Sequence, residues 1–440
     1  SIRANSQIKG KYKLSLGQRC IMSNSARRSS CNTKQDWKMV ELRGASVTGA
    51  LENRSSNSVH YTILTVLDTI FSTCVAAPAV VGYWRGTWEL SDVYIYPDNE
   101  VISCIVSIII GFSGFFVFNV TQHFLDEFFH PDKHRLSYYL GSRCYTALFG
   151  FCCVNVWRGV WQALDLATGL LPSTVFATTG IGLLALALLR ALRNIAAPPI
   201  SLSVDSCPGY FVVPTMFRVD NTRNWSLYVL DCAFSVGVIG TLVVFAWRGS
   251  WVIFDLYLYP DNPEYSAVGS VVIGYAIVVI MFSLQPVMRY ACARLKGLPR
   301  IIAVDIFLLI SFIGAVNVWR GVWNCLGLWF LPDEPELSCW ITLLGCFTLL
   351  VLLNCSNSIL VRGVYIDAEE DDEKCAAFPC HYLRLFFKIE REKKEARRQN
   401  LVVASRDLAT ITERSAKEEN GALLNASDSA TVSENPESLV

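Results

Sequence analysis

The sequence is poor in charge and in histidine. Only 17% of its 440 residues are charged, the formal net charge is zero, and there are five histidines. Soluble domains carry about a quarter charged residues, and nucleic-acid-binding domains usually have a basic excess. The sequence also lacks a P-loop, an HExxH helix and a convincing G-x-S-x-G elbow. We therefore predict no enzyme, no metal site, no cofactor and no nucleic-acid partner.

Long apolar segments are what the sequence does have, and apolar residues make up 52% of it. A helix needs about 20 such residues to cross a bilayer core. Eight segments approach this length, at about 61–83, 101–120, 138–156, 174–192, 227–246, 268–287, 301–318 and 338–360. They are too long and too continuously apolar for the strands of a β-barrel. The sequence therefore predicts an all-α integral membrane protein with eight transmembrane helices in a lipid bilayer.

Lys and Arg are distributed unevenly between these segments. They concentrate before the first, after the last, and in the connections 2–3, 4–5 and 6–7. Positive loops stay in the cytoplasm, so both termini are predicted to be cytoplasmic. The first 60 residues contain no long apolar run, so we expect no cleavable signal peptide.

The same pattern predicts the domain organisation. A basic disordered tail (1–60) precedes a first half with helices 1–4 (61–192). A cytoplasmic linker (193–226) leads to a second half with helices 5–8 (227–360). A cytoplasmic tail (361–440) follows, with a juxtamembrane amphipathic stretch and then a disordered remainder.

A five-residue motif, W-R-G-x-W, occurs four times, each time after an odd-numbered segment. Its tryptophans and arginines are Trp84, Arg85 and Trp88, then Trp157, Arg158 and Trp161, then Trp247, Arg248 and Trp251, and finally Trp319, Arg320 and Trp323. Copies one and three share the tail Tyr-Pro-Asp-Asn, and copies two and four share a leading Asn-Val. This repetition predicts four repeated helix pairs in two tandem halves, related by an axis along the membrane normal.

The composition of the motif is typical of an interface. Its two tryptophans share one helical face, indoles favour the lipid–water boundary, and glycine lets another backbone approach. An acid follows seven residues after the arginine in three copies, at Asp92, Asp165 and Asp255, so pairing with arginines across repeats is expected. The fourth copy has Gly327 there. One interpretation is an aromatic belt with a structural ring of ion pairs. The other is a ligand or ion site on the symmetry axis.

Apart from Arg190 at the end of the fourth segment, four charged residues lie inside the apolar segments, at Asp68, Arg143, Asp231 and Asp305. Charge in lipid costs several kcal/mol and usually faces the bundle interior or a partner. One interpretation is a polar pathway or coordination site formed by all four. The other is structural Asp–Arg pairing.

Two further features of the sequence suggest contacts outside the bundle core. Cys325 and Cys339 fall in or beside one outer loop, and their spacing allows a disulfide. Ser438 and the terminal Val440 form the pattern of a C-terminal PDZ ligand, which would bind a PDZ-domain scaffold as an added strand.

With four W-R-G-x-W motifs after odd-numbered segments and the paired Tyr-Pro-Asp-Asn tails, the sequence resembles the Fuseless family of invertebrate eight-pass membrane proteins. The resemblance implies a plasma-membrane, presynaptic protein that helps to place voltage-gated calcium channels and so supports synaptic vesicle exocytosis. It implies no catalytic or binding residues. From the residues alone, a transporter or channel for a small solute or ion, using the intramembrane Asp and Arg residues, is the alternative.

Overall fold

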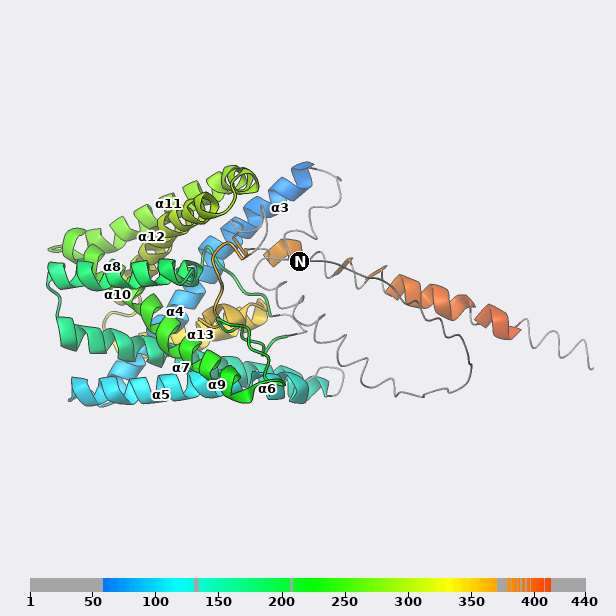
Figure 1. The fold of residues 1–440 in the computed structure, drawn as a ribbon, viewed down its shortest axis with the longest axis horizontal. Helices are drawn as coiled ribbons and strands as arrows, with labels where there is room; N and C mark the ends of the chain where they lie inside the picture. The colour runs from blue at the N-terminus through cyan, green and yellow to red at the C-terminus, as the bar shows by residue number, and fades with distance from the viewer. Residues whose placement is uncertain are drawn as a thin grey trace, which may run out of the picture.

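The structure, a computed structural model, describes residues 58–129, 134–205, 209–369, 378–380 and most of 382–412. The regular elements of residues 58–369 are all helical, and the long ones run side by side in an elongated bundle (Figure 1). The α-helices are α3 (Ser58–Phe71), α4 (Ala77–Tyr94), α5 (Glu100–Val120), α6 (Gln122–Phe128), α7 (Arg135–Thr168), α8 (Pro172–Leu188), α9 (Trp225–Phe234), α10 (Gly240–Tyr257), α11 (Pro263–Arg294), α12 (Leu298–Trp329) and α13 (Pro335–Leu352).

Each half of the chain contains one long helix interrupted by a π-helical turn. The turn Ser72–Ala76 joins α3 to α4, and the turn Ser235–Ile239 joins α9 to α10. The residues at both junctions keep right-handed helical dihedrals, so each set of three elements is one continuous rod. The two turns occupy corresponding places in the two halves.

The four motif-bearing helices form the inner part of the bundle. Contacts join α4 to α7, α7 to α10, α10 to α12 and α12 back to α4, so the four close into a ring. The other long helices lie outside it: α5 packs on α7, α8 on α10, α11 on α12, and α13 on α4. Each outer helix therefore packs mainly on the motif helix of the next repeat rather than on that of its own repeat. The helix pairs expected from the sequence are joined in the chain but are not the closely packed pairs.

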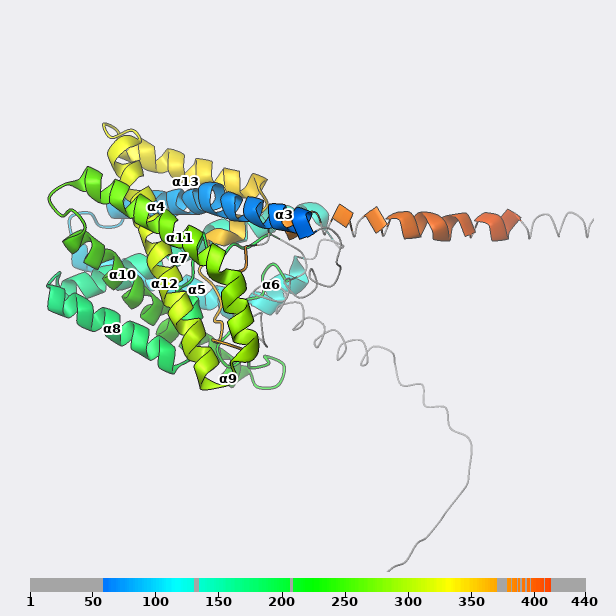
Figure 2. The same cartoon turned by 90° about the horizontal axis from the view of Figure 1, so that it is seen from above.

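The two ends of the bundle differ. At the hairpin end, short connections join α4 to α5, α7 to α8, α10 to α11, and α12 to α13. The side chains of Asn99 and Asn262, from the Tyr-Pro-Asp-Asn tails, accept hydrogen bonds from the first turns of α5 and α11 at 3.0 Å. The start of α3 and the helical residues of 382–412 lie at the opposite end, which we call the tail end (Figure 2).

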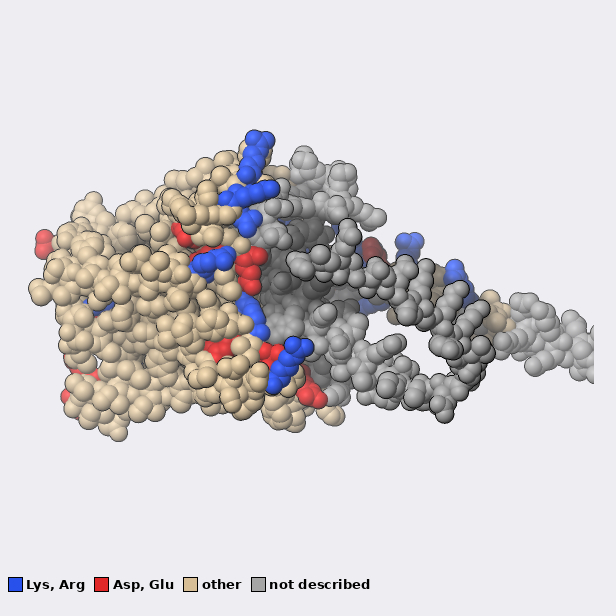
Figure 3. Space-filling view, in the orientation of Figure 1, with Lys and Arg blue, Asp and Glu red and all other residues tan. Residues whose placement is uncertain are grey.

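Charged side chains also distinguish the ends. On the face shown in Figure 3, Lys and Arg gather along the tail-end edge, whereas the body of the bundle is almost free of them. Positive charge at this end is what the predicted cytoplasmic orientation of the termini requires.

Within the part of the chain that the structure describes, six helices are long and apolar enough to cross a membrane. They cover Thr62–Tyr94, Glu100–Val120, Trp225–Tyr257, Pro263–Arg294, Leu298–Trp329 and Pro335–Leu352. Of the remaining two predicted spans, α8 has only 17 residues, and α7 includes the charged residues Arg143, Arg158 and Asp165. The all-helical, multi-pass fold is thus observed among the described residues, while eight spans remains a prediction.

Candidate functional site

The first tryptophans of the four motifs meet on the axis of the inner ring. Adjacent indoles are 5.2 Å (Trp84–Trp157), 5.6 Å (Trp157–Trp247), 5.4 Å (Trp247–Trp319) and 5.5 Å (Trp319–Trp84) apart between ring centroids, each pair edge to face. All four are buried. Such pairs contribute about 0.5–1.5 kcal/mol each beyond area burial. We call this closed group the first tetrad.

The second tryptophans repeat the arrangement one helical turn nearer the hairpin end. Centroid distances are 5.6 Å (Trp88–Trp161), 5.9 Å (Trp161–Trp251), 5.7 Å (Trp251–Trp323) and 6.0 Å (Trp323–Trp88), again edge to face. This second tetrad is half-buried. The interpretation of the motif tryptophans as a belt at the lipid boundary is therefore wrong. Their shared helical face points inward, because each motif helix contributes to the ring.

The motif arginines link neighbouring repeats. Arg158 donates to Asp92 at 2.8 Å, Arg248 to Asp165 at 2.7 Å, and Arg320 to Asp255 at 2.8 Å. Each of these three arginines thus reaches the acid of the preceding repeat, as the spacing of the acids led us to expect. The arginines are buried, whereas the aspartates are about 40% exposed.

Serines on the outer helices complete two of these links. Arg158 also donates to Ser103 and Ser107 on α5, and Arg320 to Ser266 and Ser270 on α11. The third link lacks them, and Arg248 instead donates to the carbonyl oxygen of Gly169 at 2.9 Å.

The contact between the first and last repeats is different, and we call it the seam. Arg85 should meet an acid at position 327, but Gly327 stands there. The buried Arg85 donates instead to Ser338 on α13 at 3.2 Å, and its Nε has no hydrogen-bond partner. Glu89, one turn further along α4, accepts a hydrogen bond from the Trp323 indole at 3.2 Å.

The motif glycines are points of close contact between helices. A Cβ added at Gly159 would lie 2.8 Å from the Ile108 backbone nitrogen, and one at Gly321 would lie 2.7 Å from that of Val271. The same change at Gly86 would meet the Cys339 carbonyl oxygen at 2.6 Å. Since no Cβ tolerates such distances to backbone, glycine is required for the outer helix of the preceding repeat to pack there.

The four intramembrane charges do not come together. Asp68 accepts from Arg384 at 2.7 Å, and Arg143 donates to Asp205 at 2.6 Å. Asp231 accepts from Thr215 Oγ1 and from the backbone nitrogens of residues 217 and 219. Asp305 lies within reach of the charges of Asp367 and Arg190, which are not its hydrogen-bond partners. These contacts resemble the structural pairing that the sequence offered as one interpretation.

Two short segments fold back into the tail end of the bundle. Each contains a turn of 3₁₀ helix, Leu192–Ile195 in the first half and Ser356–Ile359 in the second. Asp367 accepts hydrogen bonds from the backbone nitrogens of Leu192 and Arg193 at 2.7 Å. Asp205 does the same for Ser356 at 2.9 Å and Asn357 at 2.8 Å. Each half thus caps the 3₁₀ turn of the other half.

These segments also close the first tetrad from the tail end. The indole nitrogens of Trp84, Trp247 and Trp319 donate to the carbonyl oxygens of Ile359, Ile195 and Pro198 at 2.9, 3.0 and 2.7 Å. Sequence reasoning missed these contacts and placed residues 193–226 in a linker. The only signal was that Asp205 and Asp367 occupy corresponding positions in the two halves.

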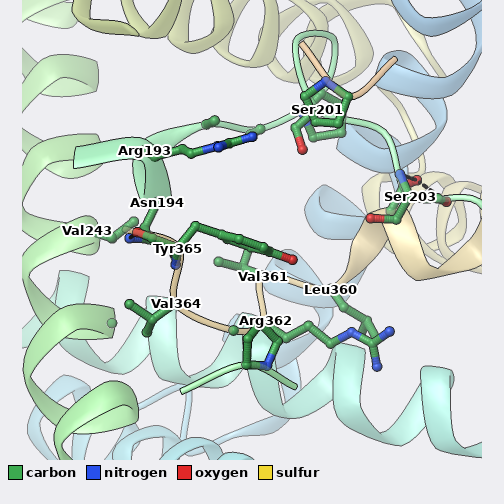
Figure 4. Close-up of a pocket in the computed structure, with 18 of the residues that line it drawn as sticks. Arg193, Asn194, Ser201, Ser203, Val243, Leu360, Val361, Arg362, Val364 and Tyr365 are labelled. Carbon is green, nitrogen blue, oxygen red and sulfur yellow. Dashed lines mark hydrogen bonds between the residues drawn. The ribbon is translucent and has the colours of Figure 1, made fainter. Parts of the chain in front are cut away.

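A cavity of about 190 Å³ lies between the first tetrad and the two returning segments. Trp84, Trp157 and Trp319 form its inner wall, together with Ile239 and Val243. The close-up shows the side nearer the tail end, where the Tyr365 ring crosses the middle of the view with Arg193 on one side of it and Arg362 on the other (Figure 4). The cavity is thus apolar at one end and polar at the other.

Two of the remaining site predictions have different outcomes. Cys325 and Cys339 are both free, so the predicted disulfide is wrong. The reason is the packing of α13, which lies mainly on α4 and not on α12, so the two cysteines of this hairpin face different neighbours. Ser438 and Val440 lie outside the described residues, and the PDZ-ligand prediction is untouched by the structure.

A helical bundle in which six helices of the described residues are long and apolar enough to cross a membrane defines the chain as a multi-pass α-helical membrane protein. The Fuseless family model matches residues 63–360, which include all four motifs, and the chain therefore belongs to the Fuseless family. Comparison with curated proteins finds no significant match, and comparison with solved structures finds none either.

Proposed function

We propose that the protein is a non-enzymatic organiser of a presynaptic membrane complex. It would lie in the plasma membrane with both tails in the cytoplasm, supporting the placement of voltage-gated calcium channels and synaptic vesicle exocytosis. Membership of the Fuseless family supports this proposal. The observation that carries it is the closed centre of the bundle, where two tryptophan tetrads fill the axis.

A rigid bundle suits a platform that holds partners in place. Carriers work by moving one bundle of helices against another around a central site. Here three arginine–aspartate pairs and eight indole contacts tie the motif helices together in a ring. Moving one repeat against the next would break contacts in both tetrads.

The predicted partners of this platform would bind its tails. The C-terminal Ser438 and Val440 would engage a PDZ-domain scaffold by strand addition. The test expresses the full chain, or the chain lacking Val440, in neurons from which the protein has been removed. The full chain should restore calcium-channel clusters and evoked release, and deletion of Val440 should lower both while leaving surface expression unchanged. Normal channel clustering in neurons without the protein would contradict the proposal.

A transporter or channel for a small solute or ion is the second candidate, and the axial cavity favours it. None of Asp68, Arg143, Asp231 and Asp305, which were to line the pathway, lies on that cavity. Solute uptake and current in vesicles reconstituted with the full chain separate the two functions. Robust flux that is lost on substituting Arg362 would favour the transporter, and absence of flux together with tail-dependent clustering would favour the organiser.

A further inference from the structure

The charged residues that line the axial cavity are all of one sign. Two arginines, Arg193 and Arg362, are among the residues that line it, and no Asp, Glu, Lys or His is. Arg193 lies over the Tyr365 ring at 5.9 Å. Arg362 donates one hydrogen bond, to the Tyr145 hydroxyl at 3.0 Å, and forms no ion pair within the described part of the chain. Arg362 is partly buried, and a partly buried cation without a counter-charge is less stable than one that is paired with an anion.

Arg362 is held in place as a charged group. Its guanidinium also lies 5.8 Å above the Tyr145 ring. Burial alone would lower the pKa of Arg362, but Tyr145 and Tyr210 act in the opposite direction and the net pKa is raised. Neighbouring hydroxyls add polar character: Ser201 and Ser203 lie on the cavity wall, and the Tyr365 ring reaches into the middle of the view (Figure 4).

At the opposite end of the cavity, two of the three lining indole nitrogens are already hydrogen-bonded. The indole nitrogens of Trp84 and Trp319 already donate to the carbonyl oxygens of Ile359 and Pro198. The rest of that wall is formed by side chains such as Ile239 and Val243. A ligand would therefore bury an apolar part there, and pockets of this kind combine an apolar lining with a few polar groups that set orientation.

We propose that this cavity binds an amphipathic anion, with its carboxylate or phosphate head at Arg362 and its apolar tail against the first tetrad. Two sources supply such a molecule. One is a soluble medium-chain carboxylate that enters from the tail-end aqueous phase. The other is an anionic single-chain lipid from the leaflet at that end of the bundle. This inference is independent of the organiser function, since a bound anion would stabilise the closed ring without being moved.

The test uses the full chain in phosphatidylcholine nanodiscs, with 2-bromooctanoate as the probe. Bromine quenches indole fluorescence on contact, and three indoles line the cavity. We expect saturable quenching that octanoate reverses. Arg362→Gln should weaken binding about tenfold, the loss of one charge-assisted contact. Arg294→Gln is the matched control, because Arg294 stacks on Tyr290 away from the cavity, and it should change affinity by less than about twofold.

A second pair of variants tests the cavity without changing its charge. Gly240 lines the cavity, and a Cβ there meets nothing closer than the Ser235 carbonyl oxygen at 4.0 Å. Gly240→Leu should fold and block the saturable quenching. Gly237 belongs to the adjacent π-helical turn, has open space around its Cβ position and does not line the cavity. Gly237→Leu should bind the probe like the unmodified chain.

Further competition experiments distinguish a lipid ligand from a soluble acid, and they define the results that would overturn the proposal. Reversal of quenching by oleoyl lysophosphatidate identifies the membrane as the source, and reversal by octanoate alone identifies the soluble acid. Both results support the proposal. Absence of saturable quenching would overturn it, as would equal binding by Gly240→Leu. Equal affinity for 2-bromooctanol that is insensitive to Arg362→Gln would also overturn it, because the cavity would then be an apolar void without preference for anions.

Discussion

Three of the four contacts between neighbouring motif helices carry an arginine–aspartate pair, and the seam between α4 and α12 does not. The three links with an ion pair join repeats that follow one another in the chain, whereas the seam joins the first repeat to the last. The indole distances are nevertheless similar at all four contacts, from 5.2 to 6.0 Å. The ring therefore closes through packing and aromatic contacts, and its charges reinforce three sides only.

Removing the acid of one link should give the largest difference in stability between a link and the seam. Asp165→Asn keeps a side-chain oxygen that can still accept from Arg248, as the Gly169 carbonyl oxygen does, but it leaves the fully buried guanidinium without its counter-charge. Breaking a buried pair in this way costs about 3–5 kcal/mol, and the partial exposure of Asp165 places the expected cost near 3. Thermal unfolding of the purified chain in detergent measures it. Glu89→Gln at the seam should cost less than half as much, and equal losses would contradict the distinction between links and seam.

Close packing, in contrast, should be equally demanding at links and seam. Gly159→Ala and Gly86→Ala both place a Cβ within 3 Å of backbone atoms of the neighbouring outer helix. Overpacking of this kind costs about 1–3 kcal/mol. Gly345→Ala is the control, because its Cβ would meet nothing within 4 Å, and it should be neutral or slightly stabilising. A harmless Gly86→Ala would mean that the seam is looser than the structure has it.

The two tetrads should differ in the same measurement. Trp247→Phe reduces the aromatic contacts of Trp247 with its neighbours in the buried first tetrad. It also removes the hydrogen bond from the Trp247 indole nitrogen to the Ile195 carbonyl oxygen. The expected cost is about 2 kcal/mol, from aromatic contacts and one hydrogen bond. Trp251→Phe in the half-buried second tetrad should cost about 1 kcal/mol. The reverse order of the two melting temperatures would show that the returning segments contribute little to closing the axis.

Much of the ring could be predicted from the sequence. The four motif copies, the periodicity of the acids and the missing acid at Gly327 all follow from the printed residues, and so does the expectation of pairing across repeats. The direction of the motif face could not be predicted, because hydropathy treats an indole facing lipid and one facing another indole alike. The axial cavity also depends on segments 191–205 and 354–369, whose short polar and apolar runs resemble ordinary loops until Asp205 and Asp367 are seen to cap turns in the opposite half.

The substitution with the smallest expected effect adds the acid that the seam lacks. Gly327 lies where the other repeats have aspartate, and a Cβ there would meet nothing within 4 Å. Gly327→Asp should therefore reach Arg85, whose Nε lacks a partner, and add about 0.5–1 kcal/mol of stability. Replacing a helical glycine is itself stabilising, so Gly327→Asn is the matched control. The aspartate variant should exceed it, and more so in a Glu89→Gln background, where Arg85 has lost its nearest acid on α4. If the two variants have the same melting temperature in that background, Arg85 does not need a counter-charge, and packing without an ion pair is enough to stabilise the seam.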